Sequence, residues 1–388
     1  MDLSAGFVFT CPFKTNSGNK ALSHLPVELA GFNAARPLVV ASAGTEGQKA
    51  VRILKSAFGD SGMTLALFDN VTQAADLGLV DHLKNLCLEK KVDAVIALGG
   101  GKAADVAKML NLAVSLKTPD ARQLLPETPI RVRLLPLVVA PAAGADGLET
   151  SRFAHLGRKV FSSESLAPVL AVLDPCLAKG KSSIGMAAAG LAALGRAVES
   201  HIQADQNPFR KAYSFAAIRF VRENLPAAVA DPGNRKASLA LLNAAAMSGC
   251  AFSNAAAGRL HKLGQVFYDL LGIPQGVIMA MCLPHILGDY LKEGQYDLAA
   301  LFQPLAGDDA FARTPAGKRA EAACDLLNRF LKELQDALGK DLPKSLAEAG
   351  VPGYRKEEIL DVLATDEEGR YLCGIVERVA NGRPERKG

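Results

Sequence analysis

Residues 92–110 read VDAVIALGGGKAADVAKML, an apolar run that ends in three glycines and then takes on a helical pattern. A short β-branched run favours a buried strand, and ligands of parallel sheets bind where such strands end. Gly99, Gly100 and Gly101 let the backbone approach a ligand closely, and the following helix directs free N–H groups at the same point. We therefore expect a phosphate or pyrophosphate here; the alternative is a tight turn that only packs the helix on the sheet.

The pattern around this turn predicts an α/β half followed by a helical half. Up to about residue 175, β-branched apolar runs alternate with amphipathic segments, which is typical of a parallel sheet covered on both faces. Beyond that point we find no convincing strand. We expect an α/β domain with a parallel, Rossmann-like sheet over residues 1–177 and an all-helical domain over residues 178–388. The expected strands are 37–42, 63–68, 92–98, 135–141 and 169–175; the expected helices are 47–59, 71–91, 102–116, 185–203, 209–225, 236–252, 320–339 and 356–364.

Composition narrows the class of protein. A chain of 388 residues with 49% hydrophobic and 22% charged residues is typical of a globular protein of two domains. The net charge of +4, with scattered lysines and arginines, argues against a nucleic-acid-binding surface. No apolar run reaches the ~20 residues that span a bilayer, and no secretory signal is visible. Seven separated cysteines without a C-x-x-C pair suggest free thiols, so we expect a cytoplasmic protein without membrane or nucleic-acid partners.

Several motifs occur in the order found in one known family. They are GGGKAADVAK (99–108), LDP (173–175), RAVES (196–200), GRLHKLGQVF (258–267) and IPQG (273–276). On these motifs the chain resembles the iron-containing (group III) alcohol dehydrogenases over nearly its whole length. The resemblance implies a dehydroquinate synthase-like fold, a dinucleotide-binding first domain, an active site between the two domains, a small-molecule substrate and a homodimer.

The resemblance breaks at the metal site of the family. The family binds its metal with an Asp and a His four residues apart on one helical face, and with two later histidines. The chain has Ala192, Arg196 and Gln275 at three of these positions, and retains only His261. One histidine does not make a stable site for a divalent metal, and the permanent charge of an arginine repels a cation. We therefore expect no catalytic metal.

The resemblance also assigns residues to a nicotinamide cofactor. The candidate cofactor-binding residues are Gly99, Gly100, Gly101, Lys102, Asp105, Ser42 and Leu173. Two threonines of the family are Ala142 and Ala143 here, and Ser42 stands where the family often has an Asp near the adenosine ribose. Loss of that carboxylate relieves repulsion of a 2′-phosphate, so NAD and NADP are both allowed. Lys102 replaces a serine, and its ammonium either pairs with phosphate or occupies the space that the phosphate needs.

The candidate catalytic residues are His261, Arg196 and Lys159, of which Lys159 matches a family lysine beside the cofactor. A histidine, with an ordinary pKa of about 6.5, suits proton donation to an alkoxide; the alternative for His261 is a structural helix histidine. Arg196 can stabilise a substrate oxyanion or clamp a substrate anion, as a metal would. The alternative is a structural ion pair, for example with Glu199.

Three further polar residues have weaker signals. Gln275 can hydrogen-bond a substrate, but a satisfied core amide is the alternative. His201 is expected on a solvated face. His155 is expected to be structural or exposed.

Two functions from different classes fit the sequence. The first is an NAD(P)-dependent oxidoreductase that interconverts a small alcohol and its aldehyde or ketone without a catalytic metal. The second is a catalytically dead member of the same fold with a binding, regulatory or assembly role, because metal ligands and cofactor threonines have been lost together. A sugar-phosphate enzyme of the dehydroquinate synthase type is a third possibility, but it too needs the missing metal.

Overall fold

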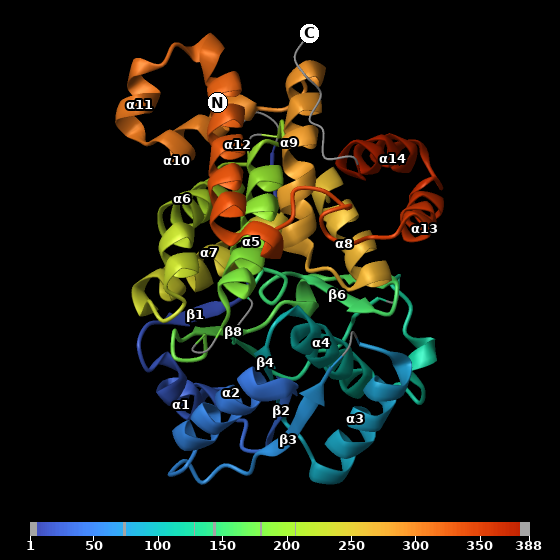
Figure 1. The fold of residues 1–388 in the computed structure, drawn as a ribbon. Coiled ribbons are helices and arrows are strands. Elements are labelled where there is room, and N and C mark those ends of the chain that lie inside the picture. Colours follow the sequence, from blue (N-terminus) through green and yellow to red (C-terminus); the bar gives the residue numbers. More distant parts are fainter. Residues whose placement is uncertain are drawn as a thin grey trace.

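The computed structural model of the protein describes residues 6–72, 75–127, 129–142, 145–178, 181–205 and 207–380. The first half of the chain forms a six-stranded sheet with the order β1-β8-β5-β4-β2-β3, in which every pairing is parallel (Figure 1). The strands are β1 (Lys14–Ser17), β2 (Pro37–Ser42), β3 (Ala66–Val71), β4 (Ala94–Gly99), β5 (Leu137–Pro141) and β8 (Leu170–Leu173). The predicted α/β half with a parallel, Rossmann-like sheet is therefore confirmed.

Helices bury both faces of this sheet, which explains why its central strands are apolar throughout. The covering helices are α1 (Leu25–Gly31), α2 (Gly44–Ala57), α3 (Leu77–Lys90) and α4 (Gly101–Ser115). Alternate residues of a strand point to opposite faces, so Ile96 joins Leu54 of α2 in one core while its neighbour Val95 joins Leu83 of α3 in the other. The sheet thus holds the end of β4, and the glycine turn after it, in a fixed place.

The start of α3 differs from the sequence prediction. We expected a helix from residue 71, whereas α3 begins at Leu77. Asp76 caps it by accepting the backbone N–H of Leu79 at 2.8 Å, which fixes the first turn at that point.

Three strands were not predicted, namely one edge strand of the large sheet and the two strands of a hairpin. The edge strand β1 has the polar sequence KTNS, which carries no apolar pattern. An antiparallel hairpin of β6 (Phe153–Leu156) and β7 (Lys159–Ser162) forms a separate two-stranded sheet. This hairpin packs beside α4 and carries a side chain into the cavity described below.

The second half of the chain is helical, and residues 181–205 and 207–380 contain no strand. Figure 1 shows these helices stacked over one end of the α/β half. They are α5 (Ser183–His201), α6 (Pro208–Ala230), α7 (Arg235–Ser253), α8 (Arg259–Leu271), α9 (Gln275–Glu293), α10 (Phe302–Ala306), α11 (Asp308–Arg313), α12 (Arg319–Leu338), α13 (Gly353–Leu363) and α14 (Glu367–Ala380). In the described part of the chain, no helix combines the length and apolarity needed to cross a membrane.

The central helix of this half is α5, which packs against α6, α7 and α9. It is therefore buried on all sides, and this burial corrects the expectation for His201. The His201 side chain is buried, its Nδ1 lies 2.8 Å from the hydroxyl of Ser214, and its Nε2 lies 3.2 Å from the carbonyl of Ala300. Burial lowers the pKa of His201 to about 4, so the ring is a neutral core group.

Candidate functional site

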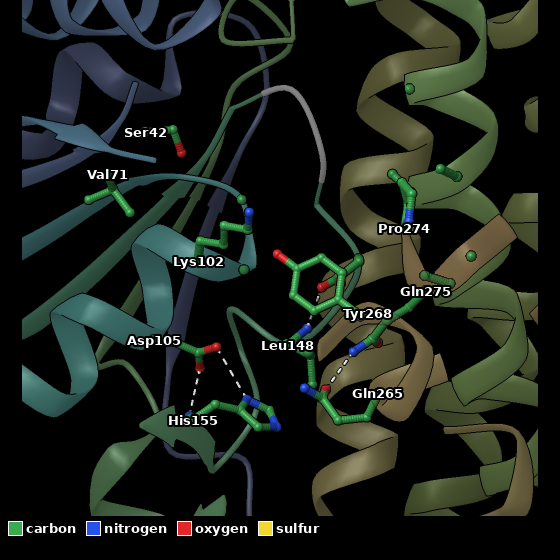
Figure 2. A pocket seen from close by; sticks show the side chains of 18 of the residues that line it. Ser42, Val71, Lys102, Asp105, Leu148, His155, Gln265, Tyr268, Pro274 and Gln275 are labelled. Carbon is green, nitrogen blue, oxygen red and sulfur yellow. Dashed lines mark hydrogen bonds and ion pairs between the residues drawn. The ribbon is translucent and has the colours of Figure 1, made fainter. Parts of the chain in front are cut away.

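A cavity of about 450 Å³ lies between the carboxyl edge of the sheet and the helical half (Figure 2). Ser42 at the end of β2 and the glycine turn after β4 form one wall. The first turns of α5, the middle of α8 and the start of α9 form the opposite wall. A volume of this size is in the range of pockets for small ligands and cofactors, and its position is the one where open parallel sheets bind them.

The glycine turn allows a close approach of two strands. Gly99 has φ +145°, and a Cβ atom there would lie 2.1 Å from Oγ of Ser42. Gly100 is the N-cap of α4 and offers no side chain to satisfy the first N–H groups of the helix. Gly100 and Gly101 both line the cavity, so these N–H groups lie beside a space that a ligand can fill.

Lys102 spans the cavity between the two halves. Its Nζ lies 3.4 Å from the carbonyl oxygen of Thr72 and 5.4 Å from the centroid of the Tyr268 ring on α8 (Figure 2). Both side chains line the cavity. The ammonium is thus held by one weak hydrogen bond and a cation–π contact, from which an anionic ligand can displace it.

The side chain of Arg196 is fully buried. It donates to the backbone carbonyl of Asp146, to Oδ2 of Asp146 at 3.3 Å and to Oε1 of Gln275. The amide of Gln275 then donates to Oε1 of Gln265 at 2.6 Å, and Gln265 donates to Oδ1 of Asp269 at 2.8 Å. We call this run from Arg196 to Asp269 the amide chain. A cation at one end and a carboxylate at the other fix the orientation of both amides.

Glu199 does not accept a hydrogen bond from Arg196. Its carboxylate accepts the backbone N–H groups of Leu260 at 2.6 Å and His261 at 3.1 Å, and so caps the start of α8. Burial raises the pKa of Glu199 to about 7. The ion pair that we considered for Arg196 therefore forms with Asp146.

His261 lies behind the cavity wall and is not one of the residues that line the cavity. Its ring packs against Phe252 with centroids 4.6 Å apart, and its Nδ1 is buried without a hydrogen-bond partner. Burial and the nearby charge of Arg196 lower the pKa of His261 well below its ordinary value. The ring is therefore neutral, and it carries only the single N–H proton of a neutral imidazole.

His155, on β6, lines the cavity, a position that the sequence did not indicate. Asp105 accepts the backbone N–H of His155 at 3.1 Å and lies 3.2 Å from its Nδ1 through the other carboxylate oxygen (Figure 2). The ring is 5% exposed, and its Nε2 has no hydrogen-bond partner among the described residues. Burial alone would lower the pKa of His155, but the charge and hydrogen bond of Asp105 outweigh it and raise the pKa.

Lys108 fixes the backbone that leads into β6. Its buried ammonium donates three hydrogen bonds of 2.8 Å, to the carbonyls of Leu148, Ser151 and Phe153. These three acceptors use all the N–H groups of the ammonium. Burial lowers the pKa of Lys108 to about 8. The lysine thus ties the loop before His155 to α4, the same helix that carries Asp105.

A second lysine that sequence reasoning missed, Lys181, lies on the helical side of the cavity. Its aliphatic stem folds over Gly185, where an added Cβ would lie 3.0 Å from Cγ of the lysine. Burial lowers the pKa of Lys181 to about 8, against the raising effect of Glu46. The segment "GKSSIG" carries no pattern that would have pointed to this lysine.

The other predicted site residues divide into two groups. Ser42, Lys102 and Asp105 line the cavity together with Gly100 and Gly101, whereas Gly99 is not among the residues that line it. Lys159 lies exposed on β7 and Leu173 lies buried within β8, so the structure does not bring either to the cavity. Their roles stay predictions.

The resemblance places two alanines at threonine positions of the family. Ala142 is buried directly after β5, and Ala143 lies outside the described residues. Among the described residues, no group of three or more His, Cys, Asp and Glu side chains lies close enough together to hold a metal ion.

Comparison with known proteins finds family models that match most of this sequence. The family model described as iron-containing alcohol dehydrogenase matches residues 12–175, and its C-terminal counterpart matches residues 186–369. The probable alcohol dehydrogenase EutG of Escherichia coli is 34% identical over 206 residues, which cover 51% of this chain and 52% of that relative. The NAD-dependent methanol dehydrogenase of Bacillus methanolicus is 24% identical over 362 residues, 92% of each chain.

The fold has close counterparts among solved structures. A crystal structure of 1,3-propanediol oxidoreductase superposes with a TM-score of 0.85 at 23% identity, and covers 96% of this chain and 99% of that one. The two family models together cover most of the sequence, in the order of the α/β half and the helical half. The chain belongs to the iron-containing alcohol dehydrogenase family.

Proposed function

We propose that the protein is an NAD(P)-dependent oxidoreductase that interconverts a small alcohol and its aldehyde or ketone without a divalent metal. The family and the relatives support the alcohol and aldehyde class, and the methanol dehydrogenase relative is NAD-dependent. The single observation that carries the proposal is the cavity, which has a glycine turn on one wall and a buried arginine in place of metal ligands behind the other. A cytoplasmic location and a homodimer belong to the same proposal.

The residues at the glycine turn fit a dinucleotide. The first N–H groups of α4 have no side-chain cap, and Gly100 and Gly101 leave the space beside them open. A pyrophosphate placed there would accept these N–H groups and the ammonium of Lys102. The absence of a carboxylate at Ser42 leaves both NAD and NADP allowed. When bound, the nicotinamide would supply or accept the hydride.

The residues at the position of the family metal do not fit a divalent cation. Ala192 has no donor atom, and the guanidinium of Arg196 is buried with a charge that it keeps at any relevant pH. The terminal nitrogens of Arg196 are already bonded to Asp146 and Gln275, both of which line the cavity. We propose that Arg196 acts by holding these two residues in place, and not by touching the substrate.

Calorimetric titration with NADH and NADPH, with metal analysis of the same sample, tests the proposal. We expect micromolar binding of one nucleotide by protein that contains no stoichiometric metal. Gly101→Val should abolish this binding, because the nearest atoms to an added Cβ are 3.9 Å away and the side chain would extend into the space beside the N–H groups. The matched control is Gly353→Val at the start of α13, where an added Cβ meets nothing within 4 Å. Stoichiometric iron or zinc would refute the metal-free proposal.

The second candidate is a catalytically dead member of the family. The observation that favours it is the carboxylate of Asp146, whose oxygens lie 3.9 Å and 4.0 Å from the Cβ position of Gly101. A carboxylate so close to the start of α4 would itself interact with the positive end of the helix dipole, where a phosphate would otherwise bind. Absence of binding by either nucleotide up to millimolar concentration would favour this candidate over the oxidoreductase.

A further inference from the structure

We propose that His155, oriented by Asp105, is the general acid and base of the reaction, a role that rests on the proposed oxidoreductase function. The proton would leave from or arrive at Nε2 of His155. Neither the resemblance nor the sequence pattern assigns a function to this histidine.

The geometry of the pair leaves one ring nitrogen free for a ligand. Asp105 engages both the backbone N–H and Nδ1 of His155, at 3.1 Å and 3.2 Å. A carboxylate at Nδ1 requires a proton there, so the neutral ring carries its lone pair on Nε2. This Nε2 is buried and has no hydrogen-bond partner among the described residues, while the ring lines the cavity. A buried nitrogen without a hydrogen-bond partner lowers the stability of the protein, and a ligand in the cavity would recover this loss by bonding to it.

The scaffold holds the pair in one geometry. Asp105 lies on α4, one turn beyond the glycine turn, so the residue that orients His155 moves with the phosphate-binding segment. Lys108, on the same helix, ties down the backbone before β6. The turn after β6 is held by a hydrogen bond of 2.8 Å from the N–H of Gly157 to the carbonyl of Ala75. Catalytic groups act efficiently when such contacts lock their orientation in advance.

Burial lowers the pKa of His155, but the charges around the ring outweigh it and raise the pKa above its ordinary value. Asp105 of α4 and Asp269 of α8 stabilise the imidazolium, while Lys108 of α4 opposes it. His261 of α8 is also within electrostatic range, and its own low pKa keeps it neutral beside a charged His155. A histidine whose charge is supported by two carboxylates and opposed by one ammonium suits proton exchange with an alcohol oxygen.

The step balances in both directions. In reduction, the carbonyl carbon would receive a hydride from the reduced nicotinamide, which would be oxidised by two electrons as the carbon–oxygen π bond breaks. The oxygen takes the proton from Nε2 of the His155 imidazolium, so an O–H bond forms as the N–H bond breaks. The neutral imidazole that remains keeps its proton on Nδ1, where the N–H donates to the carboxylate of Asp105. In oxidation, neutral Nε2 accepts the alcohol proton as the hydride leaves.

The test uses His155→Gln with His82→Gln, an exposed histidine on α3, as the matched control. We expect His155→Gln to bind NADH or NADPH as tightly as the wild type and to lose about 100- to 10,000-fold in kcat with acetaldehyde, propionaldehyde or glyceraldehyde as probes. The control should keep its kcat. His155→Gln that keeps the wild-type kcat would overturn the inference while leaving the oxidoreductase function intact. Wild type that binds neither nucleotide would overturn both.

A second readout does not depend on turnover. The protein has six histidines, so histidine labelled with carbon-13 at Cε1 gives six signals, and His155→Gln identifies one of them. We expect this signal to shift when NADH or NADPH is added, and to titrate at lower pH in Asp105→Asn, because the carboxylate that supports the imidazolium is removed. The pH limb of kcat should move in the same direction. An unchanged titration in Asp105→Asn would refute the role of Asp105.

Discussion

Replacement of Arg196 by methionine tests whether the buried guanidinium holds the cavity wall together. Methionine fills much of the same volume without charge or donors, so the substitution isolates the hydrogen bonds. The bonds lost are those to the carbonyl of Asp146, to its carboxylate and to Oε1 of Gln275. The variant should fold, because the rest of α5 is packed on apolar neighbours.

The magnitude follows from what each acceptor can find instead. The carbonyl of Asp146 and the oxygen of Gln275 lose a buried donor, which costs about 1–3 kcal/mol each. The carboxylate of Asp146 is 20% exposed and borders the cavity, so water can replace the guanidinium there. The substitution also removes the desolvation cost of the buried Arg196 charge, which offsets part of this loss. We expect the free energy of unfolding to fall by about 2–4 kcal/mol, which overlaps the lower part of the range of about 3–5 kcal/mol for breaking a buried ion pair.

A second buried arginine provides the control. Arg210 is also fully buried, but its partner Asp205 has a side chain that is 60% exposed. Water can therefore satisfy that carboxylate when Arg210 is replaced by methionine, and the loss should be smaller. Urea unfolding followed by circular dichroism measures both variants, with equal m values as the check on two-state behaviour. If Arg196→Met costs no more than Arg210→Met, the reasoning about Arg196 is wrong.

Three further outcomes can be measured. A triple variant would carry Ala192→Asp, Arg196→His and Gln275→His, which add three ligands to the one retained histidine. Metal analysis should find one zinc ion per chain in this variant and none in the wild type. Equal metal content in both would contradict the assigned positions. Lys108→Met removes one donor from each of three backbone carbonyls, although that of Leu148 keeps the N–H and hydroxyl of Ser151. The variant should lower the free energy of unfolding by about 3 kcal/mol and speed amide exchange in the loop before β6. Unchanged exchange would show that the loop is held by other contacts. Burial raises the pKa of Glu149 from 4.5 to about 7, so the folded state binds the proton more tightly than the unfolded state does. This group therefore makes the protein less stable as the pH rises from 4.5 to about 7. Glu149→Gln should make the melting temperature fall less steeply over this pH range, and an equally steep fall in the variant would refute the shift.

The fold was largely predictable because its signals are strong and local. β2 has the bounds expected from its apolar run at residues 37–42, and β4 ends at the glycine turn as the sequence indicated. The edge strand β1 was missed because a polar edge strand has no apolar pattern to read. The buried position of His201 was missed because it follows from packing of α5 on three other helices, which a single helix does not reveal.

The candidate site was predictable only where the family motifs carry it. Gly100, Gly101, Lys102 and Ser42 were assigned from the resemblance, and they line the cavity, although their roles stay predictions. His155 was missed because its partner Asp105 lies 50 residues away in sequence, and no local spacing links the two. Lys181 was missed for a similar reason, since its surroundings are set by the meeting of the two halves.

The amide chain also restricts how this sequence can change. Each amide has one accepting and one donating end, so the hydrogen bonds run in one direction from Arg196 through Gln275 and Gln265 to Asp269. Arg196 and Gln275 are buried, so a change towards a metal ligand at either position leaves the other without this partner, at a cost of about 1–3 kcal/mol. Gln265 is half-buried and Asp269 is exposed, so water can replace their bonds. Arg196 and Gln275 are therefore coupled, because either single substitution removes a hydrogen-bond partner of the other.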